Sequence, residues 1–313
     1  MTQSNTQAPS ANTPNAPKNV VLFGEVLFDC FPDGSKVIGG APFNVAWHLQ
    51  ALGDNPFFIS RIGVDALGDE LLQIAQAWGI RTLGLQRDAH HPTGQVHIKL
   101  IDQEPHYTIA PDSAFDFIEA DAAITQWSHN QTASAENTLL YHGSLALRSD
   151  FARRQFEQLQ QTLQGSIFLD VNLRAPWWEK ESLFHWLKAA RWVKLNEAEL
   201  RDLGFHQTDL RTAMQAFREH FQLEQLIVTQ GPEGASVLAP EGFKQRAPGK
   251  IDQFVDTVGA GDAFTAVYIH GLIHGWSIDK GLQKALTFAS HIIGCQGATP
   301  HDKSVYQSIF TRS

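Results

Sequence analysis

The sequence predicts an α/β protein built on a mostly parallel central sheet, with a small β-sheet attached as a lid. Short apolar runs alternate with helical patterns along most of the 313 residues, which is typical of parallel strands joined by right-handed helical crossovers. The segment 94–109 differs, because its apolar and polar residues alternate strictly before a polar turn, DQEP, at 102–105. That pattern predicts an antiparallel hairpin with one face exposed to solvent.

The strands and helices of the central sheet follow one another in chain order. Each expected strand is a short apolar run, at 20–23, 56–63, 137–144, 166–172, 190–196 and 225–231. The expected helices carry apolar residues on one face, at about 41–52, 67–79, 150–165, 197–205 and after Gly261. The lid is expected from about 25–38 and 94–110, so that two short N-terminal strands join the hairpin.

The composition indicates one large domain that follows a short tail. Hydrophobic residues make up 43% of the chain and charged residues 18%, and no Gly- or Ser-rich linker divides it. Residues 1–18 are expected to be a disordered tail, which leaves 19–313 as the domain. A net charge of −9 argues against nucleic acid or an anionic membrane as a partner. The lack of an 18-residue apolar stretch and of CxxC pairs predicts a cytoplasmic protein.

The stretch DTVGAGDAF at 256–264 brings bare backbone to a predicted helix start. Gly259 and Gly261 allow a ligand to approach closely, and the free N–H groups of a first helical turn attract anions. Asp262 would lie beside such an anion and could accept a proton from an attacking hydroxyl, and the helix field is expected to keep it ionised. The alternative is a tight turn with a dipole-stabilised acid, and these residues alone leave both open.

Other polar residues follow expected strands, where ligands bind in open parallel sheets. Asn196 and Glu199 are three apart at a strand-to-helix junction, which suits either a capping box or a Mg²⁺ site near phosphates. Arg174 could clamp a transferring phosphoryl group or form a surface salt bridge. Asp29 and Asn44 suit bidentate recognition of sugar hydroxyls, with loop capping as the alternative for Asn44.

Four motifs occur in an order that resembles the PfkB, or ribokinase-like, family of carbohydrate kinases. They are GGAPFNVA at 39–46, KLNEAEL at 194–200, VTQGPEGA at 228–235 and DTVGAGDAF at 256–264. The resemblance extends from about Val20 to the end of the chain and implies a ribokinase-like three-layer α/β/α sandwich with a β lid. Within the family, the stretches GAPFNVAWHLQALG, YHGSLALRS and DVNLRAPWW are most similar to bacterial fructokinases.

The resemblance implies a role for each motif. Asp262 would be the catalytic base, helped by Arg174 and by an anion hole made of Gly259, Ala260 and Gly261. The sugar-binding positions would be Asp29, Gly39, Gly40 and Asn44. The nucleotide side would include Asn172, Lys194, Asn196, Thr229, Gly231, Gly234 and Ser290. Glu199 would hold Mg²⁺, directly or through water, and family members often bind a monovalent cation such as K⁺ beside the loop that contains Asp256.

We therefore expect a kinase that uses ATP with Mg²⁺ to phosphorylate a small sugar, with D-fructose converted to fructose 6-phosphate. The adenine is expected near 288–298, where Ser290 replaces the Asn of many relatives and leaves the contacts open. A homodimer through the lid is implied by the family alone. The alternatives are another acceptor (2-keto-3-deoxygluconate, ribose or a nucleoside), a non-catalytic sugar-sensing protein on the same fold, and a nucleotide-dependent oxidoreductase.

Overall fold

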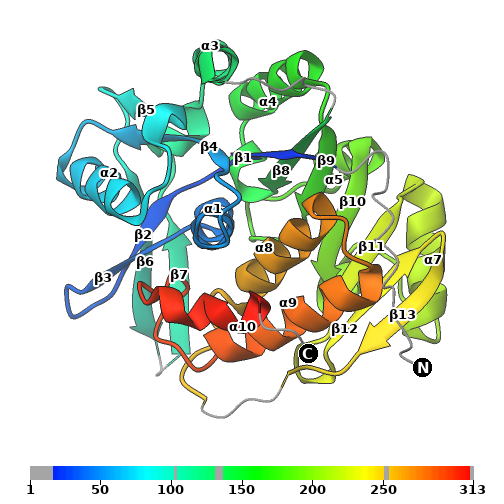
Figure 1. Ribbon diagram of the computed structural model, residues 1–313. Coiled ribbons are helices and arrows are strands. Elements are labelled where there is room, and N and C mark those ends of the chain that lie inside the picture. Colours follow the sequence, from blue (N-terminus) through cyan, green and yellow to red (C-terminus); the bar gives the residue numbers. More distant parts are fainter. Residues whose placement is uncertain (1–16, 102–103, 131–136, 250–253, 311–313) are drawn as a thin grey trace, which may run out of the picture.

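The computed structural model describes residues 17–101, 104–130, 137–249 and 254–310. The tail predicted at 1–18 lies outside these residues except for Pro17 and Lys18. The described chain forms a large sheet between two layers of helices, with a smaller sheet beside it (Figure 1). The predicted α/β fold, with its three layers and mostly parallel sheet, is confirmed.

The central sheet has nine strands within the described residues. In spatial order they are β13 (Gly242–Arg246), β12 (Ala235–Ala239), β11 (Gln225–Thr229), β10 (Ala190–Asn196), β9 (Ser166–Asp170), β8 (Thr138–Gly143), β1 (Asn19–Phe23), β4 (Phe57–Gly63) and β5 (Leu85–Asp88). Neighbours from β5 to β11 run parallel, whereas β12 and β13 add an antiparallel edge. This edge hairpin was not predicted, because the short and fully buried run ASVLA of β12 lacks the alternation that marked the lid hairpin.

Alternate side chains of each strand enter two different cores, one on each face of the sheet. In β1, Val20 and Leu22 belong to one core, and Val21 and Phe23 belong to the other. The first face is covered by α1 (Ala41–Ala51), α2 (Ala66–Trp78), α8 (Ala260–Ile273), α9 (Ile278–Ile292) and α10 (Gln307–Phe310). The second face is covered by α3 (Ala120–Asn130), α4 (Asp150–Leu163), α5 (Lys180–Ala189), α6 (Glu197–Asp202) and α7 (Leu210–Phe221). None of the helices in the described part of the chain combines the length and the apolar character needed to cross a membrane.

The smaller sheet contains the predicted hairpin and two N-terminal strands. Its order is β3 (Lys36–Gly39), β2 (Leu27–Cys30), β6 (Gly94–Ile101) and β7 (Glu104–Ile109). Strands β6 and β7 pair antiparallel, and β2 joins β6 in parallel. The register places Asp29 in one row with Val96 and Ile109, so the face of the lid that carries Asp29 is otherwise largely apolar.

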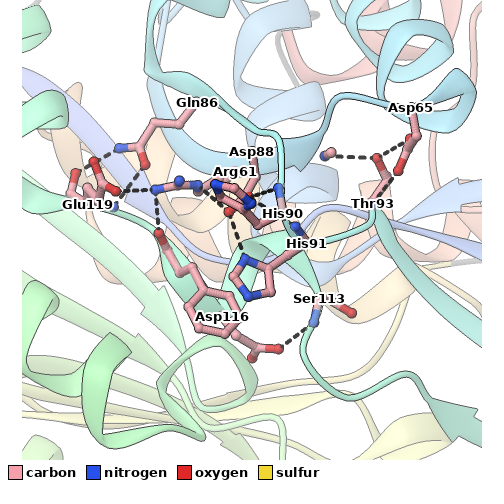
Figure 2. A network of polar contacts seen from close by, with 12 residues as sticks. Arg61, Asp65, Gln86, Asp88, His90, His91, Thr93, Ser113, Asp116 and Glu119 are labelled. Carbon is pink, nitrogen blue, oxygen red and sulfur yellow. Dashed lines mark hydrogen bonds and ion pairs between the residues drawn. The ribbon is translucent and has the colours of Figure 1, made fainter.

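A network of polar contacts joins the lid to the central sheet where β5 leads into β6 (Figure 2). The Asp88 carboxylate, 1% exposed, accepts the backbone N–H groups of His90 and His91 and pairs with Arg61 at 2.8 Å. Burial acts to raise the pKa of Asp88, but these donors outweigh it and lower the pKa to about 2. Thr93 donates from its backbone N–H and its hydroxyl to Asp65, which caps α2. The root of the lid is therefore held by contacts to the buried Asp88 and the partly buried Asp65.

Candidate active site

Polar residues gather where the central parallel strands end. Asp170 is the last residue of β9, Asn196 of β10 and Thr229 of β11. Because the carboxyl ends of parallel strands meet at one edge of a sheet, these residues share the edge at which open α/β sheets bind ligands. Helices α1 and α8 pack against each other over the first face of the sheet (Figure 1), and their N-terminal turns complete the site.

The glycine turn starts α8, and among the described residues the Ala260 N–H donates to the Thr257 carbonyl at 3.3 Å, whereas the N–H groups of Gly261 and Asp262 meet no acceptor. Gly259 is the N-cap residue with φ +78°, and no side chain caps the helix. A Cβ on Gly259 would lie 2.3 Å from the Cβ of Ala298, so both its conformation and its packing require glycine. A Cβ on Gly261 would meet only the Lys194 ammonium, at 3.4 Å. The first turn of α8 therefore presents backbone donors, with a lysine beside them, to an anion.

Asp262 lies in this first turn, and its carboxylate contacts α1. Asn44 donates from Nδ2 to Asp262 Oδ2 at 2.8 Å. Burial raises the pKa of Asp262 to about 6, although the Asn44 hydrogen bond and the Lys194 and Arg174 charges act to lower it. Desolvation, which the sequence analysis did not consider, therefore shifts the pKa of Asp262 in the direction opposite to the one that a helix start favours. The result is a stronger base than an ordinary aspartate and one still mostly ionised at pH 7.

Asn44 is an interior residue of α1, which excludes the loop-capping interpretation, since Gly40 is the N-cap. The Asn44 side chain is buried, and its Oδ1 has no hydrogen-bond partner among the described residues. Because Nδ2 is engaged by the base and Oδ1 has no partner, the Asn44 side chain is suited to accept a hydrogen bond from a ligand hydroxyl. Asn44 therefore contacts the predicted base and keeps one side-chain acceptor free for a ligand.

Two buried groups that the sequence analysis missed also face this centre. Glu25 follows β1, is 2% exposed, and burial raises its pKa to about 7, with Arg174 lowering it and Asp262 raising it. Tyr141 of β8 is fully buried, and burial raises the pKa of its phenol well above the usual value, with Asp170, Asp262 and Glu25 adding to the rise. Glu25 could have been found by the rule that revealed Asp29, because it also is an acid directly behind an apolar strand.

Lys194 and Asp170 form a buried ion pair beneath the glycine turn. The Lys194 Nζ lies 3.0 and 3.2 Å from the two Asp170 oxygens. Burial acts to lower the pKa of Lys194, but Asp170, Glu199 and Asp262 outweigh it and raise the pKa above its ordinary value. The Thr265 hydroxyl lies 2.9 Å from both Asp170 and the Gly261 carbonyl, and it can donate to either. Neither Asp170 nor Thr265 was predicted, although an acid inside the apolar run SIFLD was a visible signal.

Asn196 and Glu199 form the capping box that the sequence allowed. Asn196 Oδ1 accepts the Glu199 N–H at 2.9 Å, and Glu199 Oε2 accepts the Asn196 N–H at 2.8 Å. The other oxygen, Glu199 Oε1, accepts the N–H of Leu173 at 2.8 Å. Burial raises the pKa of Glu199, while Lys194 and these N–H groups lower it. Each carboxylate oxygen keeps one further lone pair, so a Mg²⁺ role stays a prediction.

Arg174 lies on the exposed loop that follows β9, and its charge affects the pKa of three acids at the site. Its charge lowers the pKa of Asp262, Glu25 and Asp29. Among the described residues it belongs to none of the ion pairs, so the surface salt-bridge interpretation finds no support. The phosphoryl clamp stays a prediction.

The predicted sugar positions lie between the lid and α1. Burial raises the pKa of Asp29 to about 6, and Arg174 lowers it. A Cβ on Gly39 would lie 3.0 Å from Asp29 Oδ2, so the glycine keeps room beside this carboxylate. Gly40 has φ +105°, and a Cβ there would lie 2.6 Å from the Glu25 carbonyl oxygen. The structure thereby brings three predicted sugar residues to the N-terminal turn of α1.

The predicted nucleotide residues are less tightly connected. Asn172 has φ +41° behind β9, and Gly231 has φ +55° with open space around it. Gly234 is explained by packing, since a Cβ would lie 2.0 Å from the Arg246 carbonyl oxygen. Ser290 donates to the Gly249 carbonyl at 3.1 Å. Asp256 accepts the Val258 N–H at 3.0 Å. The nucleotide and K⁺ roles of these residues stay predictions.

Comparison with known families agrees with this geometry. The model described as "pfkB family carbohydrate kinase" matches residues 19–304. The protein is therefore a carbohydrate kinase, a phosphotransferase with an alcohol group as acceptor. It belongs to the pfkB family of carbohydrate kinases.

Several proteins named fructokinase are similar to this chain in sequence or in fold. The chain is 29% identical to probable fructokinase-5 of Arabidopsis thaliana over 310 residues, with 90% of each chain covered. It is 29% identical to the fructokinase of Escherichia coli over 267 residues, covering 81% of this chain and 84% of the other. Two solved structures are similar in fold. They are a fructokinase with bound ATP from Xylella fastidiosa (TM-score 0.78, 20% identity, 94% and 100% covered) and a fructokinase in fructose, ADP and calcium ion bound form from Vibrio cholerae O395 (TM-score 0.73, 24% identity, 93% and 98% covered).

Proposed function

We propose that this kinase transfers the γ-phosphoryl group of ATP to D-fructose and forms fructose 6-phosphate. The observation that carries the proposal is Asp262, a desolvated carboxylate in the first turn of α8 beside open N–H groups and in contact with Asn44. ATP is supported by neighbours solved with that nucleotide, and fructose by the names of the relatives at 28–29% identity.

The glycine turn would stabilise the group being transferred. Phosphoryl transfer proceeds through a loose transition state with charge spread over the phosphoryl oxygens, so the protein contributes mainly positioning and electrostatic stabilisation. The N–H groups of Gly261 and Asp262 and the positive end of α8 would face these oxygens. The Lys194 ammonium lies behind the turn and adds positive charge there.

Asp262 would take the proton of the sugar hydroxyl as its oxygen attacks phosphorus. Its pKa of about 6 leaves it ionised at neutral pH and makes it a better proton acceptor than a solvated aspartate. Asn44 would hold the carboxylate in one orientation through its Nδ2 and offer Oδ1 to the sugar. Asp29 on the lid would bind further hydroxyls, and the apolar lid face around it would exclude water that competes as acceptor.

Mg²⁺ would offset the negative charge of the nucleotide phosphates when bound. The residues at the site fit a water-mediated arrangement, because both Glu199 oxygens already accept backbone N–H groups and retain one lone pair each. Mg²⁺ usually keeps several waters and uses few protein carboxylates, which such a site can supply. Glu199 would hold these waters, and Asn196 would hold Glu199 in place.

The test is ADP release from Mg-ATP with purified protein and a panel of acceptors. The panel contains fructose, ribose, glucose, mannose, adenosine, fructose 6-phosphate and 2-keto-3-deoxygluconate. We expect strong turnover with fructose alone. Turnover with another acceptor would keep the mechanism and change the substrate. Folded protein that binds ATP but releases no ADP with any acceptor would favour a sugar-sensing role.

The base is tested by Asp262→Asn. Asparagine keeps an oxygen for Asn44 but cannot take a proton, so kcat should fall by roughly 10²–10⁴-fold while the affinity for ATP changes little. Asp202→Asn, an exposed acid on α6, is the matched control and should be fully active. Near-normal turnover in Asp262→Asn would rule out this mechanism.

A further inference from the structure

A cluster of two histidines and an aspartate lies outside the candidate active site. His270 lies on the last turn of α8 and His274 is its C-cap residue, four positions later, while Asp54 follows the C-terminus of α1. Among the described residues, this is the group of three or more His, Cys, Asp or Glu side chains whose ligand atoms could hold one metal ion, all within 4.8 Å of one another. Two of the 14 histidines of the chain belong to this cluster.

The geometry of the cluster is well defined. Asp54 Oδ2 lies 2.8 Å from His270 Nδ1, and Asp54 Oδ1 lies 2.8 Å from His274 Nε2. The side chains of Asp54 and His270 are 2% and 6% exposed, whereas that of His274 is 50% exposed. Two ligands are thus fixed by burial, and the third can adjust and leaves an open side to solvent.

We propose that Asp54, His270 and His274 bind a transition-metal dication such as Zn²⁺. Two imidazoles and one carboxylate form a donor set that suits Zn²⁺ and its neighbours and not Mg²⁺ or Ca²⁺, which prefer oxygen ligands. Bonds of about 2.0–2.2 Å to a tetrahedral ion place ligand atoms roughly 3.3 Å apart. The present N···O separations therefore need to widen only by about 0.5 Å, which the half-exposed His274 ring allows. Water from the open side would complete the coordination.

The ion would join the two helices that carry the active site. Near their N-termini, α1 and α8 are linked by the hydrogen bond from Asn44 to Asp262. Near their C-termini they are linked by Asp54 and the two histidines. At 1.5 Å per residue, His270 lies about 12 Å along α8 from Asp262. A metal bound at the far end would therefore fix the parallel α1–α8 pair without contacting the substrates.

The test is a Zn²⁺ titration of untagged, nucleotide-free protein by calorimetry, with melting temperature measured in parallel. We expect one equivalent to bind and to raise the melting temperature, since an ion that binds only the folded state stabilises it. His274→Ala and Asp54→Asn should each weaken binding by roughly tenfold or more. His291→Ala, an exposed histidine on α9, should bind as the wild type does. Co²⁺ in place of Zn²⁺ should give the visible absorption of a tetrahedral site in the wild type and lose it in His274→Ala.

Absence of Zn²⁺ binding to the wild type would overturn the proposal. Binding that is equally strong in both cluster variants would also overturn it, because the ion would then use other histidines. His274 is half exposed, so its alanine variant should fold and allow the comparison even if Asp54→Asn is unstable. The assay contains no nucleotide or sugar, so its result does not depend on whether fructose is the acceptor.

Discussion

At the scale of the residue, burial of Glu25 makes the free energy of unfolding depend on pH near neutrality. Its carboxyl is 2% exposed, and Oε2 has no hydrogen-bond partner among the described residues. Burial raises its pKa from an ordinary value of 4.5 to about 7. The folded protein therefore binds a proton between these two pH values that the unfolded chain has released, and its stability falls as pH rises through this range.

Glu25→Gln should remove this pH dependence. Glutamine has the same shape and no charge, so the variant should gain about 2–3 kcal/mol over the wild type on going from pH 5 to pH 8. Urea unfolding at several pH values measures the difference. Glu219→Gln, an exposed acid on α7, is the control and should follow the wild-type curve. Parallel curves for Glu25→Gln and the wild type would contradict a raised pKa at Glu25.

At the scale of one element, α8 connects the chemistry to the core. Its body is buried within the first core, while its first turn is open to ligand. Gly259 allows this start by adopting φ +78° directly against Ala298. The direction of the open N–H groups and of Asp262 therefore depends on one glycine.

Gly259→Ala should displace the turn and reduce kcat by at least about tenfold, because small misplacements of catalytic groups are costly. Gly275→Ala is the matched control, since Gly275 also has positive φ, +65°, but has open space around it. Both variants should lose about 1 kcal/mol or more of stability from the positive φ. Only Gly259→Ala should lose activity. Equal activity in the two variants would show that the contact with Ala298 does not position the turn.

At the scale of the whole molecule, we predict that two copies of the chain assemble through the lid. Phe31, Val37 and Tyr107 lie on or beside the lid strands and are 38%, 39% and 63% exposed. The family resemblance implies a homodimer through this sheet, and pairing would cover these side chains.

Light scattering of the purified protein tests this assembly. We expect a dimer for the wild type and a monomer for Tyr107→Asp, because a charge in the interface would be buried without a partner. Leu83→Asp changes an apolar side chain that is 48% exposed away from the lid strands, and it should leave the dimer intact. A monomeric wild-type protein, or a dimer that Tyr107→Asp does not affect, would contradict assembly through the lid.

The fold could be predicted largely from local patterns. Apolar runs followed by amphipathic helices specify parallel strands and crossovers, and the alternation in 94–109 specifies the lid hairpin, because each pattern reflects which faces must be buried. The antiparallel edge at β12 and β13 was not predicted, because a short and fully buried strand such as β12 shows no alternation of apolar and polar residues. Asp262 and the glycine turn could be recognised as a candidate site because glycines and an acid at a predicted helix start suit either an anion-binding turn or a tight turn, and few other structures.

The fold class, the kinase family and the motif that holds Asp262 could therefore be recognised from the order of the amino acids. The folded structure was needed to see how the groups at the site interact. It brought Asn44 to Asp262, Asp54 to His270, and Glu25 into a buried position, in each case joining residues from different segments of the chain. It also raised the pKa of Asp262, because desolvation depends on the density of atoms that distant segments pack around a carboxylate. No local pattern of residues records that density.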